Sequence, residues 1–142
     1  MLEQLTSEFC PILAERDLEW KLDIMPDITL VGDVDKLARA FDNLIRNAVS
    51  YSYAGTEISL YAQTEGNQIK VMLKNQGKTI PQDKLEHIFE QFYRVDAARS
   101  SVTGGAGLGL AIAKEIVELH GGTITAASAN ENTIFIVILP ID

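Results

Sequence analysis

The chain has 142 residues, 46% of them hydrophobic, which is enough to bury one core without disulfides or a structural metal. Twelve basic against twenty acidic side chains give a net charge of −8, which excludes broad electrostatic attraction to nucleic acid or to an anionic membrane. The single cysteine, Cys10, cannot form an intramolecular bridge, and no apolar run is long enough to cross a bilayer. We therefore expect one soluble domain from a reducing compartment, which holds any polyanionic ligand by local groups.

The first 31 residues predict a helix and two strands. Residues 2–16 carry apolar side chains at helical spacing, and Pro11 is expected to kink or split this helix. Alternation over residues 18–24 predicts a strand, and a short second strand is expected at residues 28–31. Residues 1–16 look like a helical linker from something upstream, which leaves residues 17–142 as the domain proper.

A second helix is expected after Asp33, which has the residue type of an N-cap. One apolar stripe runs along it: Leu37, Ala38, Phe41, Leu44, Ile45, Ala48 and Val49. Asn43 and Asn47 stand one turn apart on the face away from that stripe. Because Asn is a poor helix former, this pair belongs either to a solvated face or to a site that uses the amide oxygens.

Two strands, a polar turn and a short helix are predicted in the middle of the chain. Strands are expected at residues 56–64 and 68–73, joined by a turn of hairpin composition. The second strand runs into a polar turn at residues 74–81, where side chains can point into a cleft. A helix is expected at residues 83–92, followed by an irregular segment.

Residues 104–110 form a glycine-rich turn that leads into the most apolar helix of the chain. The helix is expected to begin inside the glycines, so its unpaired amides and its positive dipole end favour an anion such as a phosphate. Leu110 and Ala111 stand where a P-loop needs other residues, and no strand precedes the turn as a dinucleotide fingerprint requires. The helix is expected to end at His120, before two glycines.

The last two strands are expected at residues 123–127 and 133–139, around a turn at residues 128–132. Strands and helices do not alternate regularly, which disfavours a doubly wound parallel sheet. The fold class expected is therefore α/β of the α+β type. It is a two-layer α/β sandwich, in which about three helices cover one face of a mixed sheet of about five strands.

Four of these stretches together resemble the ATP-binding catalytic domain of sensor histidine kinases, a branch of the gyrase, Hsp90 and MutL ATPase superfamily. Residues 43–51 are similar to the family's N box and residues 75–81 to its first glycine box. Residues 89–94 are similar to its F box and residues 104–110 to its second glycine box. The resemblance covers residues 18–140, and four motifs in the correct order make it specific.

The resemblance implies a nucleotide site with an adenine end and a phosphate end. Asn47 would bind Mg²⁺ through its amide oxygen, supported by Asn43, because Mg²⁺ prefers oxygen ligands. At the adenine end the resemblance implies Tyr51, Asn75 and Gly77, with Thr133 acting through water. Arg94 and Arg99 would reach the phosphates, residues 95–106 would form a mobile ATP lid, and the backbone around the phosphates would come from Gly105, Gly107, Leu108 and Gly109.

Three positions depart from the family pattern. Asn75 replaces the usual Asp, which is expected to lower ATP affinity by about 1 kcal/mol, or about fivefold, and to weaken discrimination against guanine. Ser50 replaces a Lys that contacts phosphate, and Thr79 replaces the second glycine of the first glycine box. The hypothesis is that the domain binds ATP weakly but still productively.

The implied activity is that of a histidine protein kinase, with Asn47, Arg94 and Arg99 as the catalytic groups. The domain would position Mg-ATP for γ-phosphoryl transfer to a histidine on a separate dimerisation domain of the same kinase, and a response regulator would act downstream. Neither His87 nor His120 has the sequence context of the acceptor, so no autophosphorylation is expected from this chain alone. The implied location is cytoplasmic, in a membrane-anchored sensor whose catalytic part itself makes no direct membrane contact.

Three alternatives stay open. A related ATPase needs a Glu where this chain has Asn43, and the adjacent Asp42 is turned by about 100° around the helix. An anti-sigma-factor serine kinase shares the nucleotide site but lacks this linker context. A degenerate nucleotide-binding or scaffold domain would explain the changes at Ser50 and Asn75, but not the retention of Asn47, of both arginines and of all the lid glycines.

Overall fold

The computed structural model describes residues 1–93 and 108–141. In this part of the chain five strands form one mixed sheet in the order β1-β2-β3-β5-β4. β1 pairs with β2 in parallel, and the other neighbours are antiparallel. The strands are β1 (Glu19–Ile24), β2 (Glu57–Glu65), β3 (Gln68–Gln76), β4 (Thr123–Ala129) and β5 (Asn132–Pro140). The predicted mixed sheet of a two-layer sandwich is confirmed.

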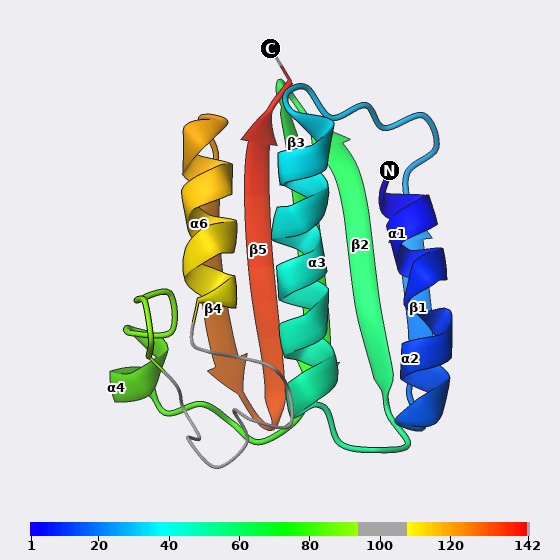
Figure 1. Cartoon of the computed structure of the whole chain (residues 1–142), viewed down its shortest axis with the longest axis vertical. Helices are drawn as coiled ribbons and strands as arrows, with labels where there is room; N and C mark the ends of the chain where they lie inside the picture. The colour runs from blue at the N-terminus through cyan, green and yellow to red at the C-terminus, as the bar shows by residue number, and fades with distance from the viewer. Residues whose placement is uncertain (94–107, 142) are drawn as a thin grey trace.

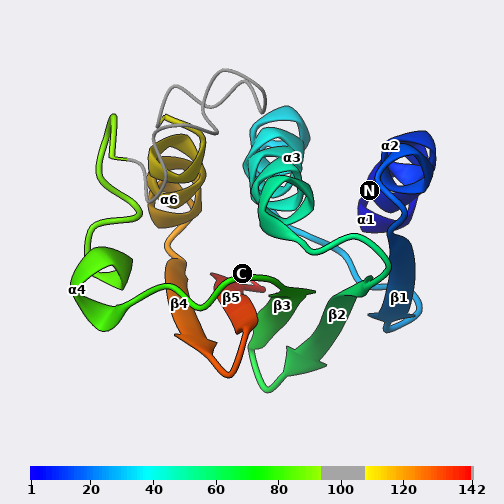
Figure 2. The same cartoon turned by 90° about the horizontal axis from the view of Figure 1, so that it is seen from below.

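The helices lie on one face of this sheet. Figure 2 shows the first two helices, α3 and α6 side by side above the strands, while α4 packs beside β4. Their bounds are α1 (Leu2–Glu8), α2 (Cys10–Glu15), α3 (Val34–Tyr51), α4 (Gln82–Leu85) and α6 (Gly109–Leu119). The predicted lid, residues 95–106, lies outside the described residues.

The N-terminal helix is split into α1 and α2, as Pro11 predicts. Pro11 lies in the first turn of α2, where a missing N–H leaves no helical hydrogen bond unmade. Four apolar side chains of the two helices and the residue between them join the core: Leu2, Leu5, Phe9 and Leu13. Trp20 on β1 donates its indole N–H to the carbonyl of Thr6 at 2.9 Å. The segment is therefore packed on the domain, and its role as a linker stays a prediction.

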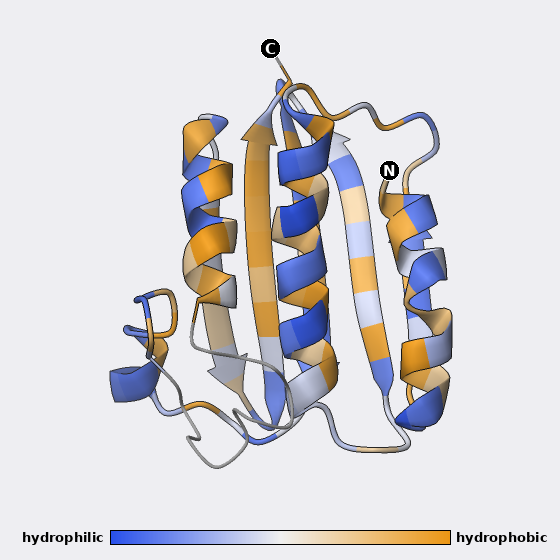
Figure 3. Cartoon of the chain, in the orientation of Figure 1, coloured by the Kyte–Doolittle hydropathy of each residue, from blue (hydrophilic) through white to orange (hydrophobic). Residues whose placement is uncertain are grey.

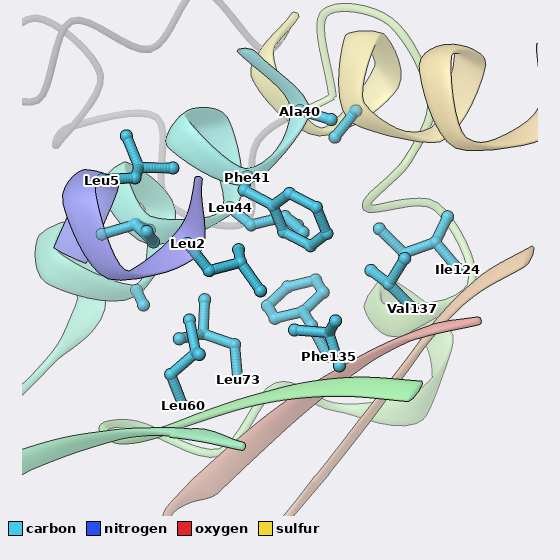
Figure 4. Packing of buried hydrophobic residues seen from close by; sticks show 14 of the residues in the cluster. Leu2, Leu5, Ala40, Phe41, Leu44, Leu60, Leu73, Ile124, Phe135 and Val137 are labelled. Carbon is cyan, nitrogen blue, oxygen red and sulfur yellow. The ribbon is translucent and has the colours of Figure 1, made fainter. Parts of the chain in front are cut away.

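The core fills the space between α3 and the sheet. Figure 4 shows the ring of Phe41, from α3, next to the ring of Phe135, from β5, and both residues are at most 2% exposed. The outward side of α3 is largely hydrophilic, whereas β5 is hydrophobic along most of its length (Figure 3). The helix is thus amphipathic, and its apolar stripe holds it on the middle of the sheet.

The ends of α3 and α6 are closed as the sequence predicts. The carboxylate of Asp33 accepts the amide of Lys36 at 3.1 Å, which confirms Asp33 as the N-cap of α3. At the end of α6, the amide of Gly122 bonds to Val117 and that of Gly121 to Glu118, both at 3.0 Å. This is a Schellman motif, and the φ of +78° at Gly121 explains the glycine there.

Two predicted elements are wrong. Residues 28–31 form no strand, because this segment leaves the sheet edge and crosses to the helical layer to begin α3 (Figure 1). Its alternation arises because Ile28 and Leu30 are the side chains packed against the core. The helix expected at residues 83–92 is only α4, since the chain continues in tight turns and reaches a φ of +67° at Phe92.

Candidate functional site

Two buried polar residues lie opposite each other where β3 and β5 pair. Asn75 and Thr133 are register partners, 3% and 5% exposed, on the sheet face that carries the core. β3 continues to Gln76, beyond the predicted end at residue 73, so Asn75 is held by the sheet and does not lie in a turn. Strand pairing therefore fixes the position of this amide in relation to the Thr133 hydroxyl.

The amide of Asn75 makes no hydrogen bond to another residue within the described ranges. The Thr133 hydroxyl is within 2.9 Å of the Ser128 hydroxyl, which in turn accepts the amide of Ile80 at 2.9 Å. The donor and the acceptor of the Asn75 amide are therefore open to a ligand that presents an acceptor and a donor.

Gly77 brings the turn after β3 against the end of α3. A Cβ at this position would overlap the carbonyl oxygen of Tyr51 and would lie 3.4 Å from the amide nitrogen of Asn75. Only glycine therefore permits this approach. The consequence is that Tyr51, which is half-buried, lies close to the Asn75 and Thr133 pair.

Asn43 and Asn47 are half-buried on α3, and are not a fully solvated face. The amide nitrogen of Asn43 is buried and has no hydrogen-bond partner among residues 1–93 and 108–141. A Cβ built on Gly109 would be 3.8 Å from the Asn43 Cβ, an ordinary van der Waals contact. The helix pair α3 and α6 thus places Asn43 beside the start of α6.

The start of α6 offers backbone donors. The helix begins at Gly109, and Leu108 occupies the N-cap position with no side-chain hydrogen bond to the first-turn amides in the described part of the chain. Free amides at a helix N-terminus favour an anion. Arg94, Arg99, Gly105 and Gly107 lie outside the described residues.

The sequence did not predict that Glu131 is the centre of a cluster of hydrogen bonds, which we call the Glu131 node. Its amide donates to the Thr79 hydroxyl at 2.7 Å, its carbonyl accepts the amide of Gly77 at 3.0 Å, and its carboxylate accepts the Tyr53 hydroxyl at 3.0 Å. The hydrogen bond to Glu131, with some desolvation, raises the pKa of Tyr53. The hairpin position of Glu131 is its only sequence signal, and that signal does not indicate these partners.

The site can hold an oxygen-rich anion more readily than a bare metal ion. In the described ranges no three His, Cys, Asp or Glu side chains gather where they could hold a metal. A hard cation such as Mg²⁺ fits one amide oxygen on α3 only if the ligand's own oxygens and waters complete its coordination. The Asn43 amide and the first-turn amides of α6, which have no side-chain partner among the described residues, fit such an anion.

Comparison with known families matches residues 32–142 to the histidine kinase-, DNA gyrase B-, and HSP90-like ATPases. Sensor protein VanSC of Enterococcus gallinarum is 49% identical over 140 residues, 99% of this chain and 38% of that protein. Sensor protein VanS of Enterococcus faecium is 50% identical over 99% of this chain and 36% of its own length. The chain thus spans less than two fifths of these relatives.

The motifs at residues 75–81 and 94–122 by themselves predict similarity to the vancomycin-resistance sensor kinase, and the VanS and VanSC matches confirm this prediction. Among solved structures, the mycobacterial sensor histidine kinase MprB has a TM-score of 0.81 at 28% identity, covering 99% of this chain and 93% of that one. The catalytic domain of histidine kinase ThkA has a TM-score of 0.85 at 23% identity, covering 97% and 88%. None of the helices described here is long and apolar enough to cross a membrane.

Proposed function

Because the chain belongs to the histidine kinase-, DNA gyrase B-, and HSP90-like ATPase family, we propose that it is the ATP-binding catalytic domain of a sensor histidine kinase. It would present ATP for γ-phosphoryl transfer to a histidine on a separate dimerisation domain. The observation that carries the proposal is the unpartnered amide of Asn75, buried beside Thr133 and reached by the Gly77 turn. These groups match the adenine end that the motifs imply.

At the adenine end, Asn75 would accept the exocyclic amino group of the base, and Thr133 would act through water. Tyr51 would lie against the ring. The positions of all three are set by backbone pairing or by a glycine contact, so little ordering is needed when the base enters. A neutral amide acceptor makes a weaker bond than a carboxylate, and we infer a modest affinity for ATP.

At the phosphate end, Asn47 would be the protein ligand of Mg²⁺, with Asn43 beside it. Gly109 and the first-turn amides of α6 would face the phosphates, joined by Leu108, Gly105, Gly107, Arg94 and Arg99. Bound Mg²⁺ supplies neutralisation of the charge on the phosphate oxygens. The chain's own residues orient the triphosphate and exclude water.

The phosphoacceptor would lie outside this chain, for different reasons at each of its two histidines. His120 uses both ring nitrogens inside the fold: Nδ1 bonds the Ile116 carbonyl at 2.8 Å, and Nε2 accepts the amide of Asp33 at 3.1 Å. His87 is exposed and forms a hydrogen-bonded pair with Glu90 one turn away. We therefore infer that the chain alone does not phosphorylate itself.

Hydrolysis of ATP by this domain is less well supported. Asn43 has no proton-accepting group at neutral pH, so it cannot activate water as a carboxylate would. Asp42 is engaged by Arg46 at 2.7 Å on the hydrophilic side of α3. A degenerate scaffold is disfavoured because such a domain has no need of the buried Asn43 amide nitrogen, which has no hydrogen-bond partner among the described residues.

The partners we propose follow from this role. They are the dimerisation and phosphoacceptor domain of the same kinase and, downstream, a response regulator. The similarity to VanS and VanSC favours a sensor of the antibiotic-resistance type, anchored in a membrane by another part of the protein and with this domain in the cytoplasm.

The test is a calorimetric titration of the folded chain with ATP, with and without Mg²⁺, and with GTP as control. We expect ATP binding that Mg²⁺ strengthens and that exceeds GTP binding. A folded chain that binds neither nucleotide would contradict the proposal. An ATP affinity that is the same with and without Mg²⁺ would contradict the proposed role of Asn47.

A further inference from the structure

The hairpin between β4 and β5 is joined to the adenine end by one residue. Glu131 uses its amide, its carbonyl and its carboxylate on three different partners: Thr79, Gly77 and Tyr53. The partners come from two segments, the turn after β3 and the loop after α3, which lie 52 to 78 positions away in the sequence. The amide of Tyr53 also donates to the Gln76 carbonyl at 2.9 Å. Three segments are therefore joined at Glu131.

The backbone at this position is unusual for a glutamate. Asn130 and Glu131 have φ of +53° and +61°, the conformation of a two-residue hairpin turn in which the second position favours glycine. A glycine would keep the amide and carbonyl bonds but would lose the carboxylate. A glutamate held in this region suggests that its side chain has a use.

Thr79 gives the node a second feature particular to this chain. Thr79 stands at the second glycine of the first glycine box, and its hydroxyl accepts the amide of Glu131. A glycine there has no such acceptor and leaves the turn more conformational freedom. The threonine thus ties down a turn that would otherwise be mobile.

The node lies next to the groups assigned to the base. The amide that Glu131 holds is that of Gly77, the residue whose contact with Tyr51 admits no side chain and which lies against Asn75. We call Tyr51 and Asn75 the adenine wall. A shift of the turn would therefore move both residues of this wall.

We propose that Glu131 is a positioning residue which, through Thr79 and Tyr53, pre-organises the adenine wall before nucleotide binds. The proposal rests on the proposed function, because it assigns Tyr51 and Asn75 to the base. The Glu131 contacts would offset part of the ATP affinity that is lost through the neutral acceptor at Asn75. They do so because a wall that is already ordered loses less conformational entropy when the nucleotide binds.

The test uses Thr79→Val, which keeps the shape but removes the hydroxyl, and Tyr53→Phe, which removes the other hydroxyl. Thr79→Ser, which retains an acceptor, is the matched control. We expect each of the first two to raise the Kd of ATP and of adenosine about fivefold, the value of one hydrogen bond, and the control to change it less than twofold. The strengthening of ATP binding by Mg²⁺ should stay at its wild-type factor, because the phosphate end is untouched.

A further variant, Glu131→Gly, separates positioning from general stability. It relieves the positive φ and removes the carboxylate, so we expect an unchanged or higher Tm together with about fivefold weaker ATP binding. In nucleotide-free protein, Thr79→Val should also speed hydrogen exchange at the amides of Gly77 and Glu131.

Wild-type ATP affinity in Thr79→Val and Tyr53→Phe would overturn the inference while leaving the proposed function intact. An equal loss in Thr79→Ser, or a loss of the Mg²⁺ factor, would also overturn it, since either points to general damage. A wild-type chain that is folded yet binds no ATP would refute the proposed function and, with it, the assignment of this wall to adenine.

Discussion

At Asn75, replacing the amide nitrogen of the side chain by an oxygen should change the affinity for nucleotide directly. In Asn75→Asp, we expect ATP to bind about fivefold more tightly, because a charged acceptor makes a stronger bond to the adenine amino group. In the absence of nucleotide the same change should lower Tm, since it buries a carboxylate at a position that is 3% exposed. Titration calorimetry and a thermal melt of the same sample measure both effects.

The comparison nucleotide for this variant is GTP. Asn75→Asp should increase the preference for ATP, because a carboxylate cannot turn round to offer a donor as an amide can. If ATP and GTP affinities rose or fell together, Asn75 would not be the residue that reads the base.

Asn47 is the corresponding residue at the phosphate end. In Asn47→Asp we expect Mg-ATP binding to fall at least tenfold, because a negative charge is placed beside the triphosphate, while adenosine binding stays within twofold. Calorimetry with both ligands measures this, and circular dichroism checks that the fold is intact. Unchanged Mg-ATP binding in a folded variant would rule out Asn47 as the Mg²⁺ ligand.

The protonation of the His87 ring can be followed directly as the pH changes. Hydrogen bonding to Glu90, and then the charge of Glu90, raise its pKa above the ordinary value of 6.5. A raised pKa means that the folded state binds the proton more tightly, so this stabilisation is fully present below about pH 6.5 and is lost as pH rises through the folded-state pKa. NMR titration of the His87 ring should show a lower pKa in Glu90→Gln than in the wild type, although the charges of Glu86 and Asp83 still raise it, and an unchanged pKa in that variant would contradict the assignment.

The contact between the helices α3 and α6 is fixed at both of its ends. Gly109 lies against Asn43 at one end, and His120 bonds the amide of Asp33 at the other. Ten residues separate Asp33 from Asn43, and eleven separate Gly109 from His120, so at about 1.5 Å per residue the two spans match to within about 2 Å. The His120 contact therefore sets the register that brings the start of α6 to Asn43.

Gly32→Ala should break this contact. The added Cβ would overlap the His120 ring, and the φ of +140° at Gly32 already disfavours any side chain. We expect a loss of about 2 kcal/mol in the free energy of unfolding, measured by urea titration, and a shift of the Gly109 amide signal in NMR spectra. Lys36→Ala on the exposed side of α3 is the control and should do neither; an unmoved Gly109 signal in Gly32→Ala would show that the register does not depend on His120.

The elements that could be predicted from the sequence are those with local causes. Asp33 begins α3 and Gly121 ends α6 through hydrogen bonds to residues a few positions away. The hairpin of β2 and β3 follows from alternating apolar and polar residues on both sides of a turn. Residues 28–31 were mispredicted because packing on one side produces the same alternation as a strand. Local pattern cannot tell these two causes apart.

The candidate site could be predicted only in part. The amides on α3 and at the end of β3 belong to short motifs, so their residues could be proposed from the sequence. The burial of Asn75 could not, because it follows from the length of β3 and not from its own neighbours. Glu131 could not be found, because its partners lie more than 50 residues away and no local pattern indicates them.

At the scale of the whole molecule, the candidate site lies at one end of the sheet, and the helices packed on the sheet hold its residues in place. The adenine end that we propose is formed by β3, β5 and the end of α3, whereas the proposed phosphate end lies between α3 and α6. α3 contributes to both ends, and its apolar stripe packs on the Phe135 side of the sheet (Figure 4). Damage to this one helix should therefore affect base and phosphate binding together.

The strand order has a consequence for how the protein is made. β5 is the last strand to leave the ribosome, yet in the sheet it lies between β3 and β4 and supplies both Thr133 and the register of Asn75. Until its residues emerge, β4 has no partner and one edge of β3 is open. A chain that stops before residue 132 thus contains β1 to β4 but lacks Thr133 and the strand that holds Asn75, so we expect it to bind no ATP.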